Sequence, residues 1–407
     1  MAQESLVRQV NDWLAQQALG EPEMIALFEG LCERLYAIGI PVSRALLSWP
    51  TLHPLFRAEA VLWRRGMPSQ LDQLNYANTT AEAWLKSPMA FMLERNLKVL
   101  RRRLQGPQAL LDFPILVDLA AENFTDYLAV ITEFQHPGVY AEFSRRGFVV
   151  TWATDRVGGF SDEDAASLQQ IQQRLAVACK TVIQARVART ITETYLGKHA
   201  GDQVLRGSIR LGDGEVTHCI VWYSDLRDST RLAETLPSAD FLKLLNRYFE
   251  CAARPALEAG GEVLAFIGDA VLAIFPIDAG TDLEAMAGRV FEGLRKSMVM
   301  AGEMNAEQAR DGMEAFRFGI GLTIGEVMFG NIGVPERLAF SAIGPTVIEV
   351  ARIEKLTKTL GYPVLATGGV AALSPGTWRT IGEHPLQGVG QPKELFGFLS
   401  EAAAVAA

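Results

Sequence analysis

Two aspartates, Asp225 and Asp269, have the sequence context of a paired acidic site. Asp225 follows the apolar run 219–223, and Asp269 belongs to a Gly268-Asp269 pair between two apolar runs. Apolar runs bounded by turn residues predict buried strands, and a two-residue Gly-Asp connection predicts a tight hairpin. Helical spacing of apolar residues over 239–258 places a helix between the two acidic positions.

Carboxylates at a strand end and at a hairpin tip can face each other across neighbouring strands. Hard divalent cations such as Mg²⁺ bind a few carboxylates together with phosphate oxygens of a substrate. Two such ions about 4 Å apart can activate a hydroxyl and neutralise leaving phosphates. Taken singly, an aspartate after a strand or in a hairpin is more often a cap or turn residue. The pair in this frame favours a metal site.

Three blocks of sequence resemble the catalytic domain of class III adenylate and guanylate cyclases. They read YSDLRDST at 223–230, GGEVLAFIGDAVLAIFP at 260–276 and AIGPTVIEVARIEKLTK at 342–358. The resemblance covers residues 216–398 and implies a head-to-tail dimer with ATP at the interface. It also implies that Asp225 and Asp269 hold two Mg²⁺ or Mn²⁺ ions, which drive attack of the ribose 3′ oxygen on the α-phosphate.

The same resemblance gives roles to further residues. It implies that Arg352 stabilises the charged transition state and that Ser341 approaches the nucleotide base. A turn and helix start after Asp225 would meet the triphosphate through free N–H groups. The residues of this turn that are expected to bind substrate are Leu226, Arg227, Ser229 and Thr230.

The chain departs from the family pattern at three positions. Asp228 stands where the family usually has glycine, and its charge would repel phosphates unless it points away. Ala265 replaces the lysine that reads adenine, and Ile348 replaces the asparagine that orients the ribose. Neither side chain can form a hydrogen bond. ATP remains the expected substrate by the resemblance, and GTP is not excluded.

Composition sets limits on the class of protein. The chain has 407 residues, 49 % hydrophobic and 21 % charged, which indicates a globular protein of two or three domains. A net charge of −9 and a pI near 5.3 argue against a nucleic-acid partner. The sequence has no apolar run long enough to span a bilayer, so no membrane insertion is expected. Four scattered cysteines and five dispersed histidines indicate buried thiols in a reducing cytoplasm and no zinc site.

Residues 1–160 are predicted to form an α/β sensor module. Helical patterns cover 7–37, with a break at Glu21-Pro22, and 114–122. The stretch 68–82 is interpreted as a loop, and the basic run over 91–104 as a solvated helix face. Strands are expected at 41–50, 60–66, 127–132 and 147–153.

The end of this module, GFVVTWATDRVGGFSDEDAASLQQIQQRLAVA at 147–178, is similar to the last strand and terminal helix of GAF-type sensor domains. Trp49, Trp63 and Trp152 could line a ligand pocket, although core packing is the usual role of such residues. Ser161 with Asp164 three positions on predicts a helix start, and Gly197 a helix stop. The segment 161–210 is therefore expected to be a helical linker, either a parallel dimerisation helix or a passive spacer.

Together these features predict an α/β (α+β) protein of three segments. A GAF-like sensor module at 1–160 precedes the helical linker, and a ferredoxin-like βαββαβ cyclase domain occupies 211–400. The expected function is conversion of ATP to cyclic AMP and pyrophosphate by a cytoplasmic homodimer, regulated by the N-terminal module. A heterodimer with another cyclase stays open. So does a degenerate cyclase that acts as a regulatory partner, because Asp228, Ala265 and Ile348 depart from the pattern.

Overall fold

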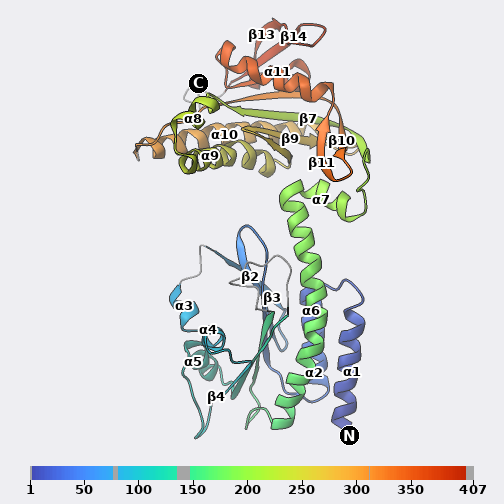
Figure 1. The fold of residues 1–407 in the computed structure, drawn as a ribbon, viewed down its shortest axis with the longest axis vertical. Helices are drawn as coiled ribbons and strands as arrows, with labels where there is room; N and C mark the ends of the chain where they lie inside the picture. Colours follow the sequence, from blue (N-terminus) through green and yellow to red (C-terminus); the bar gives the residue numbers. More distant parts are fainter. Residues whose placement is uncertain (1, 77–80, 135–146, 311, 400–407) are drawn as a thin grey trace. The chain divides into compact units, whose positions relative to one another are not determined.

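The computed structural model describes residues 2–76, 81–134, 147–310 and 312–399. The chain divides into two compact units, Met1–Ile191 and Thr192–Ala407. Each unit contains one sheet with helices packed on both faces, so the predicted mixed α/β class is confirmed (Figure 1). In the described ranges, no helix is long and apolar enough to cross a membrane.

The first unit contains a six-stranded antiparallel sheet in the order β3-β2-β1-β6-β5-β4. Four of these strands, β1, β2, β5 and β6, lie where the alternating and apolar runs predict them. The strands are β1 (Arg44–Pro50), β2 (Phe56–Arg64), β3 (Gln70–Asn75), β4 (Val99–Arg103), β5 (Asp126–Thr132) and β6 (Phe148–Thr154).

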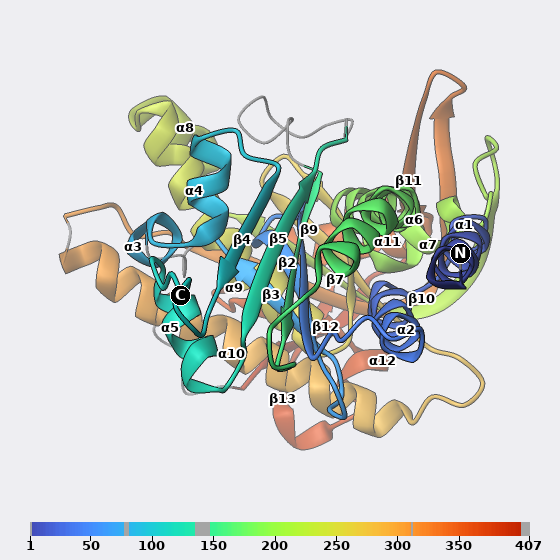
Figure 2. The same cartoon turned by 90° about the horizontal axis from the view of Figure 1, so that it is seen from below.

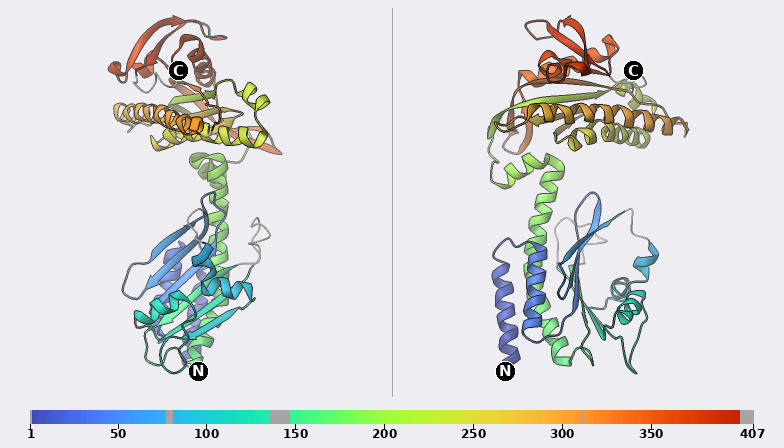
Figure 3. Two further views of the ribbon diagram at one scale, coloured as in Figure 1. Left: turned by 90° about the vertical axis from the view of Figure 1, so that its left-hand side faces the viewer. Right: turned by 180° about the vertical axis from the view of Figure 1, so that it is seen from behind.

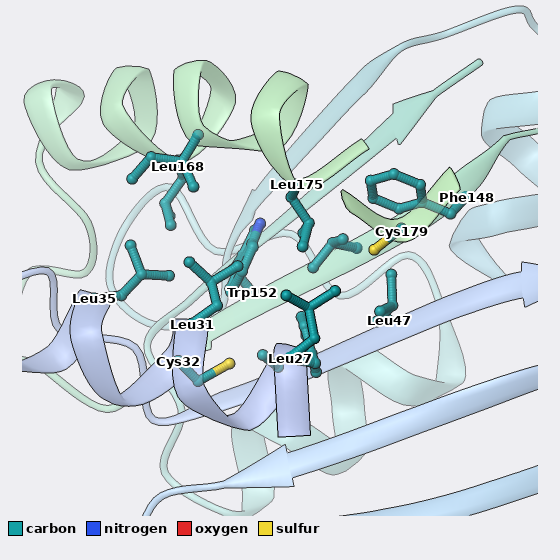
Figure 4. Packing of buried hydrophobic residues seen from close by; sticks show 14 of the residues in the cluster. Leu27, Leu31, Cys32, Leu35, Leu47, Phe148, Trp152, Leu168, Leu175 and Cys179 are labelled. Atoms are coloured by element: carbon teal, nitrogen blue, oxygen red, sulfur yellow. The ribbon is translucent and has the colours of Figure 1, made fainter. Parts of the chain in front are cut away.

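Three helices cover one face of this sheet: α1 (Ala2–Gln17), α2 (Met24–Ala37) and α6 (Asp162–Leu196). Figure 4 shows Leu31 of α2 and Leu175 of α6 converging on Trp152 of β6. Three short helices flank the other face, beside β4 and β5 (Figure 2). They are α3 (Ala81–Leu85), α4 (Pro88–Glu94) and α5 (Pro114–Ala121).

Two sequence interpretations in this unit are wrong. The stretch 68–82 is not only loop, because β3 is an edge strand whose polar, exposed side chains hide its pairing with β2; residues 77–80 lie outside the described residues. The run 91–104 is not a solvated helix face, because β4 follows the short α4. Arg101 and Arg103 donate from β4 to the fully buried Asp126 carboxylate at 2.9 and 2.8 Å. That partner is distant in the sequence, so the charge run alone could not indicate it.

The start of α6 confirms the predicted cap. The Asp164 N–H donates to the Ser161 hydroxyl at 3.0 Å, and the Ser161 N–H donates to the Asp164 carboxylate at 2.8 Å. Gly197, with φ +86°, ends the helix as expected. From Ala165 to Val187, α6 contributes a row of buried side chains to the core of the first unit. Over this length α6 is a structural part of that unit and not only a connection.

The second unit contains an eight-stranded sheet in the order β13-β14-β12-β10-β7-β9-β8, with β11 paired to β10. Neighbouring strands are antiparallel except β10 and β12, which are parallel. The strands are β7 (Gly214–Leu226), β8 (Glu262–Ile267), β9 (Ala270–Pro276), β10 (Phe318–Val334), β11 (Arg337–Ile343), β12 (Val364–Thr367), β13 (Trp378–His384) and β14 (Lys393–Phe398).

Side-chain alternation along β7 separates the two faces of this sheet. Helices α9 (Ser238–Glu258) and α10 (Leu283–Arg310) cover one face of the sheet and α11 (Pro345–Leu360) covers the other (Figure 3). Ile220 and Trp222 belong to the core on the side of α9 and α10, whereas Cys219 and Val221 face the side of α11. The smaller helical elements are α7 (Lys198–Leu205), α8 (Ser229–Thr235), α12 (Gly368–Ala371) and the 3₁₀ turn η1 (Pro375–Thr377). Asp225 has the same parity as Val221 and therefore lies on the face of α11.

Candidate active site

Strand register brings the two predicted metal ligands together. Asp225 of β7 pairs with Ala270, the first residue of β9, and Asp269 precedes Ala270 at the tip of the β8–β9 hairpin. Gly268 has φ +66° while Asp269 does not adopt a positive φ, which is the pattern of a type II′ turn. The side chain of Asp269 lies within hydrogen-bonding reach of the Asp225 carboxyl.

The proximity of the two carboxyls has an electrostatic consequence. Burial, followed by the charge of Asp269 and the hydrogen bond with it, raises the pKa of Asp225 to about 7. A divalent cation between the carboxylates would remove this repulsion, so the donor set fits Mg²⁺ or Mn²⁺. Within the described ranges, no group of three or more His, Cys, Asp or Glu side chains could hold a metal. Backbone carbonyls, water or substrate oxygens would then complete the coordination.

A third acidic side chain, Glu354, lies beside this pair and was missed in the sequence. Glu354 is 7 % exposed on α11, and burial, together with the charge of Asp225, raises its pKa to about 7. The helix can approach the sheet here because β10 has glycines at 319 and 321. A Cβ at Gly319 would lie 2.4 Å from Glu354 Oε1, and a Cβ at Gly321 would lie 2.6 Å from the carbonyl oxygen of Val350. Alternating glycines on β10 were the sequence signal for this close contact.

Arg227 lies between the acidic group and the turn before α8. Its Nε and Nη2 atoms are buried, and no described residue accepts a hydrogen bond from them. Burial lowers the pKa of Arg227, while the negative charge of Glu354 opposes that shift. The Arg227 N–H donates to the carbonyl oxygen of Arg317 at 2.8 Å. A half-buried guanidinium with free donors fits an anionic ligand.

Asp228 has the left-handed conformation that favours glycine, with φ +59°. Its carboxylate pairs with Lys358 at 2.7 Å and lies 3.8 Å from Arg317. The hydrogen bond from Lys358 lowers the pKa of Asp228, so the carboxylate stays ionised and paired. The negative charge of Asp228, which was expected to repel phosphates, is thus paired with Lys358.

The other residues of this turn that were predicted to bind substrate differ in their burial. Leu226 is 4 % exposed and lies in the core, so its side chain is structural. Ser229 and Thr230 begin α8, and Thr230 is exposed. The sequence therefore locates the turn correctly, but the structure leaves Arg227, Ser229 and Thr230 as its polar side chains.

Arg352 lies on α11, half-buried, four residues after Ile348. The Nε atom of Arg352 is buried and has no hydrogen-bond partner in the part of the chain that the structure describes. Among the interactions of the described residues, none joins Arg352 to the Asp225–Asp269 pair. Within the described ranges, Arg352 and the Asp225–Asp269 pair are therefore not in direct contact.

The predicted base- and ribose-binding positions lie on neighbouring elements. Ser341 of β11 pairs with Gly330 and is half-buried, whereas Ala265 of β8 follows an irregularity in the pairing with β9. Strands β8 and β11 are in contact. Ile348 on α11 is 55 % exposed. Neither the exposed Ile348 nor the small Ala265 offers a side-chain hydrogen bond.

Comparisons with known proteins find similar sequences and structures. An uncharacterised protein of Mycobacterium tuberculosis (strain CDC 1551 / Oshkosh) is 31 % identical over 211 residues, which are 49 % of this chain and 35 % of that protein. The adenylate cyclase of Anabaena cylindrica is 29 % identical over 163 residues, 40 % of this chain and 32 % of the relative. This chain is similar to a nucleotide cyclase.

The similarity is partial in extent. The chain spans roughly a third of the length of the first curated relatives it matches. A crystal structure of a guanylyl cyclase is 26 % identical, with a TM-score of 0.40, over 46 % of this chain and 95 % of that chain. No protein-family model matches the chain. Both adenylyl and guanylyl cyclases are therefore among the similar proteins.

Proposed function

We propose that this protein is a class III nucleotide cyclase that converts ATP to cyclic AMP and pyrophosphate. The observation that carries the proposal is the Asp225–Asp269 pair, in which strand pairing brings two carboxyls within hydrogen-bonding reach of each other. Similarity to an adenylate cyclase supports the same reaction class. The connectivity β7–α9–β8–β9–α10–β10, with strand order β10-β7-β9-β8, supports the expected ferredoxin-like arrangement.

Each part of the site has a distinct task in this proposal. Asp225 and Asp269 would hold the divalent ions, which when bound activate the ribose hydroxyl and neutralise phosphate charge. Arg227, Ser229 and Thr230 would contact the triphosphate near the start of α8. Arg352 would stabilise charge in the transition state, and Ser341 would approach the base.

The proposal includes a homodimer. Arg352 has no described contact with the aspartate pair, as expected if the two groups meet only across an interface. Exposed apolar side chains surround the hairpin and β11, and a second subunit would remove them from water. They are Phe266, Ile267, Met328, Ile332, Val334, Ile343 and Ile348.

A second candidate function is that of a degenerate cyclase that regulates a partner. The exposed Ile348 and the small Ala265 favour it, because they remove hydrogen bonds to ribose and base. Such a chain would bind nucleotide weakly and would use its dimer surface chiefly for assembly.

The test is cyclic nucleotide formation by the full chain, with ATP or GTP and with Mg²⁺ or Mn²⁺. We expect cyclic AMP from ATP and its loss in Asp225→Ala. Asp240→Ala is the matched control, because Asp240 pairs with Lys243 on the exposed surface of α9. Activity that survives Asp225→Ala would disprove the assigned chemistry. Absence of product with both nucleotides and both metals would favour the degenerate cyclase.

A further inference from the structure

The first unit has a cavity on the side of its sheet where α3 and α4 lie. Its volume is about 150 Å³. The walls come from the ends of β1 and β2, from β5 and β6, and from the two short helices. The side chains that matter most for its chemistry are Trp49, Arg57, Leu74, Trp84, Met89 and Leu93.

The lining is apolar apart from Ser48 and Arg57. The Ser48 hydroxyl donates to the carbonyl oxygen of Glu59 at 3.3 Å, so its proton is already used. Arg57 is the one charged residue among the described residues that line the cavity. A ligand here would meet hydrophobic walls and a single positive charge.

The Arg57 guanidinium is held against an aromatic ring, with its central carbon 5.2 Å from the centroid of Trp84. Stacking on the ring restricts the guanidinium and leaves its N–H groups free to donate. No carboxylate of the described residues pairs with Arg57. A half-buried cation without an acidic partner complements an anionic ligand group.

We propose that this cavity binds a small aromatic carboxylate. A cavity of this volume suits one six-membered ring, since an engineered apolar cavity of similar size in another protein holds benzene. The ring would pack among the tryptophan, leucine and methionine side chains. Its carboxylate would accept hydrogen bonds from Arg57, because a buried anion without a partner is very unfavourable.

The experiment measures binding of benzoate to the full chain by calorimetry and tryptophan fluorescence, since Trp49 and Trp84 line the cavity. Benzamide is the neutral probe of matched shape, and acetate is the anion without a ring. We expect saturable benzoate binding with Kd roughly 0.1 mM, judged from ligand size. Benzamide and acetate should bind at least about tenfold more weakly.

Variants separate the charge from the cavity. Arg57→Gln should weaken benzoate about tenfold or more and leave benzamide unchanged. Arg65→Gln is the control, because Arg65 follows β2 but pairs with Asp155 at 2.6 Å. Ala58→Leu should fill the cavity and weaken both aromatic probes. Equal affinity for benzoate and benzamide, benzoate binding unaffected by Arg57→Gln, or no saturable benzoate binding at several times the expected Kd would overturn the proposal.

Discussion

The acidic end of β7 and the surface expected to bind base and ribose are built in opposite ways. Asp225, Asp269 and Glu354 are held by strand register and by close packing of a helix on glycines. Ile348 is exposed and Ala265 is half-buried like the two aspartates, and neither side chain offers a hydrogen bond. The chain thus retains the groups that would act on phosphates and lacks two that would act on the rest of the nucleotide. Under the proposed function, the groups assigned to phosphate chemistry and those assigned to nucleotide recognition would have separate structural supports and could be lost separately.

The largest effect on activity is expected from removal of one carboxylate of the Asp225–Asp269 pair. Asp269→Asn should lower kcat about a thousandfold, because it removes one ionic ligand while keeping the hairpin. The measurement is initial rate of cyclic nucleotide formation over a range of Mn²⁺ concentrations. Asp278→Asn, an exposed position beyond β9, is the control and should retain full activity. A normal rate in Asp269→Asn would remove the acidic pair from the mechanism.

Arg352 tests whether transition-state charge is stabilised by α11. Arg352→Gln should lower kcat about a hundredfold with a small change in KM, because the guanidinium is expected to act on developing charge. Lys355→Gln, exposed on the same helix, should have little effect. Steady-state kinetics of the two variants, with kcat and KM measured separately, test whether Arg352 acts in the transition state or in substrate binding. A large rise in KM with unchanged kcat would make Arg352 a substrate-binding residue instead.

Nucleotide recognition should improve when hydrogen-bonding side chains are introduced at the positions expected to contact base and ribose. Ala265→Lys combined with Ile348→Asn should raise kcat/KM for ATP about tenfold, because both groups would orient the nucleotide. Leu257→Asn, another exposed apolar residue, is the control for added polarity. Rates with ATP and GTP should be compared in parallel. If kcat/KM rises for neither nucleotide, Ala265 and Ile348 are not what limits nucleotide recognition.

The sequence predicted the acidic pair because two local signals, a strand end and a Gly-Asp hairpin, were sufficient to place it. Glu354 was missed, since its burial depends on how α11 packs against β10 and the alternating glycines of β10 indicate a close contact without identifying its partner. The same holds for Arg101 and Arg103, whose partner Asp126 is 25 and 23 residues away. Local patterns predicted elements well, and they failed where a charge finds its partner through tertiary packing.

The acidic cluster should also make stability depend on pH. Asp225 and Glu354 both have pKa values of about 7 in the fold, whereas unfolded carboxyls titrate near pH 4. Between these values the folded state binds more protons, so the free energy of unfolding falls as pH rises from about 4 to 7. We expect a loss of about 1 kcal/mol, reduced from the full linkage value by solvent screening.

Urea unfolding of the metal-free protein at several pH values checks this expectation. Asp225→Asn should flatten the profile because it removes one of the titrating groups. Added Mn²⁺ should stabilise the native chain more at pH 8 than at pH 5, since metal binding requires ionised carboxylates. A profile that rises over the same range would contradict the electrostatic description of the acidic cluster.

The smallest expected effect concerns Asp228, which lies at the junction of the two regions. The Asp228 carboxylate forms an ion pair with Lys358, and the Asp228 backbone adopts the left-handed conformation that glycine prefers. Asp228→Gly should lower KM for ATP by a few-fold at low salt, because Lys358 and Arg317 would then face phosphate without a competing anion. Asp228→Asn removes the same charge but keeps a side chain that tolerates the left-handed conformation.

If both variants lower KM equally, charge is the cause. If only the glycine variant does, backbone geometry limits phosphate binding, and an unchanged KM in both would mean that the Asp228–Lys358 pair lies outside the nucleotide site.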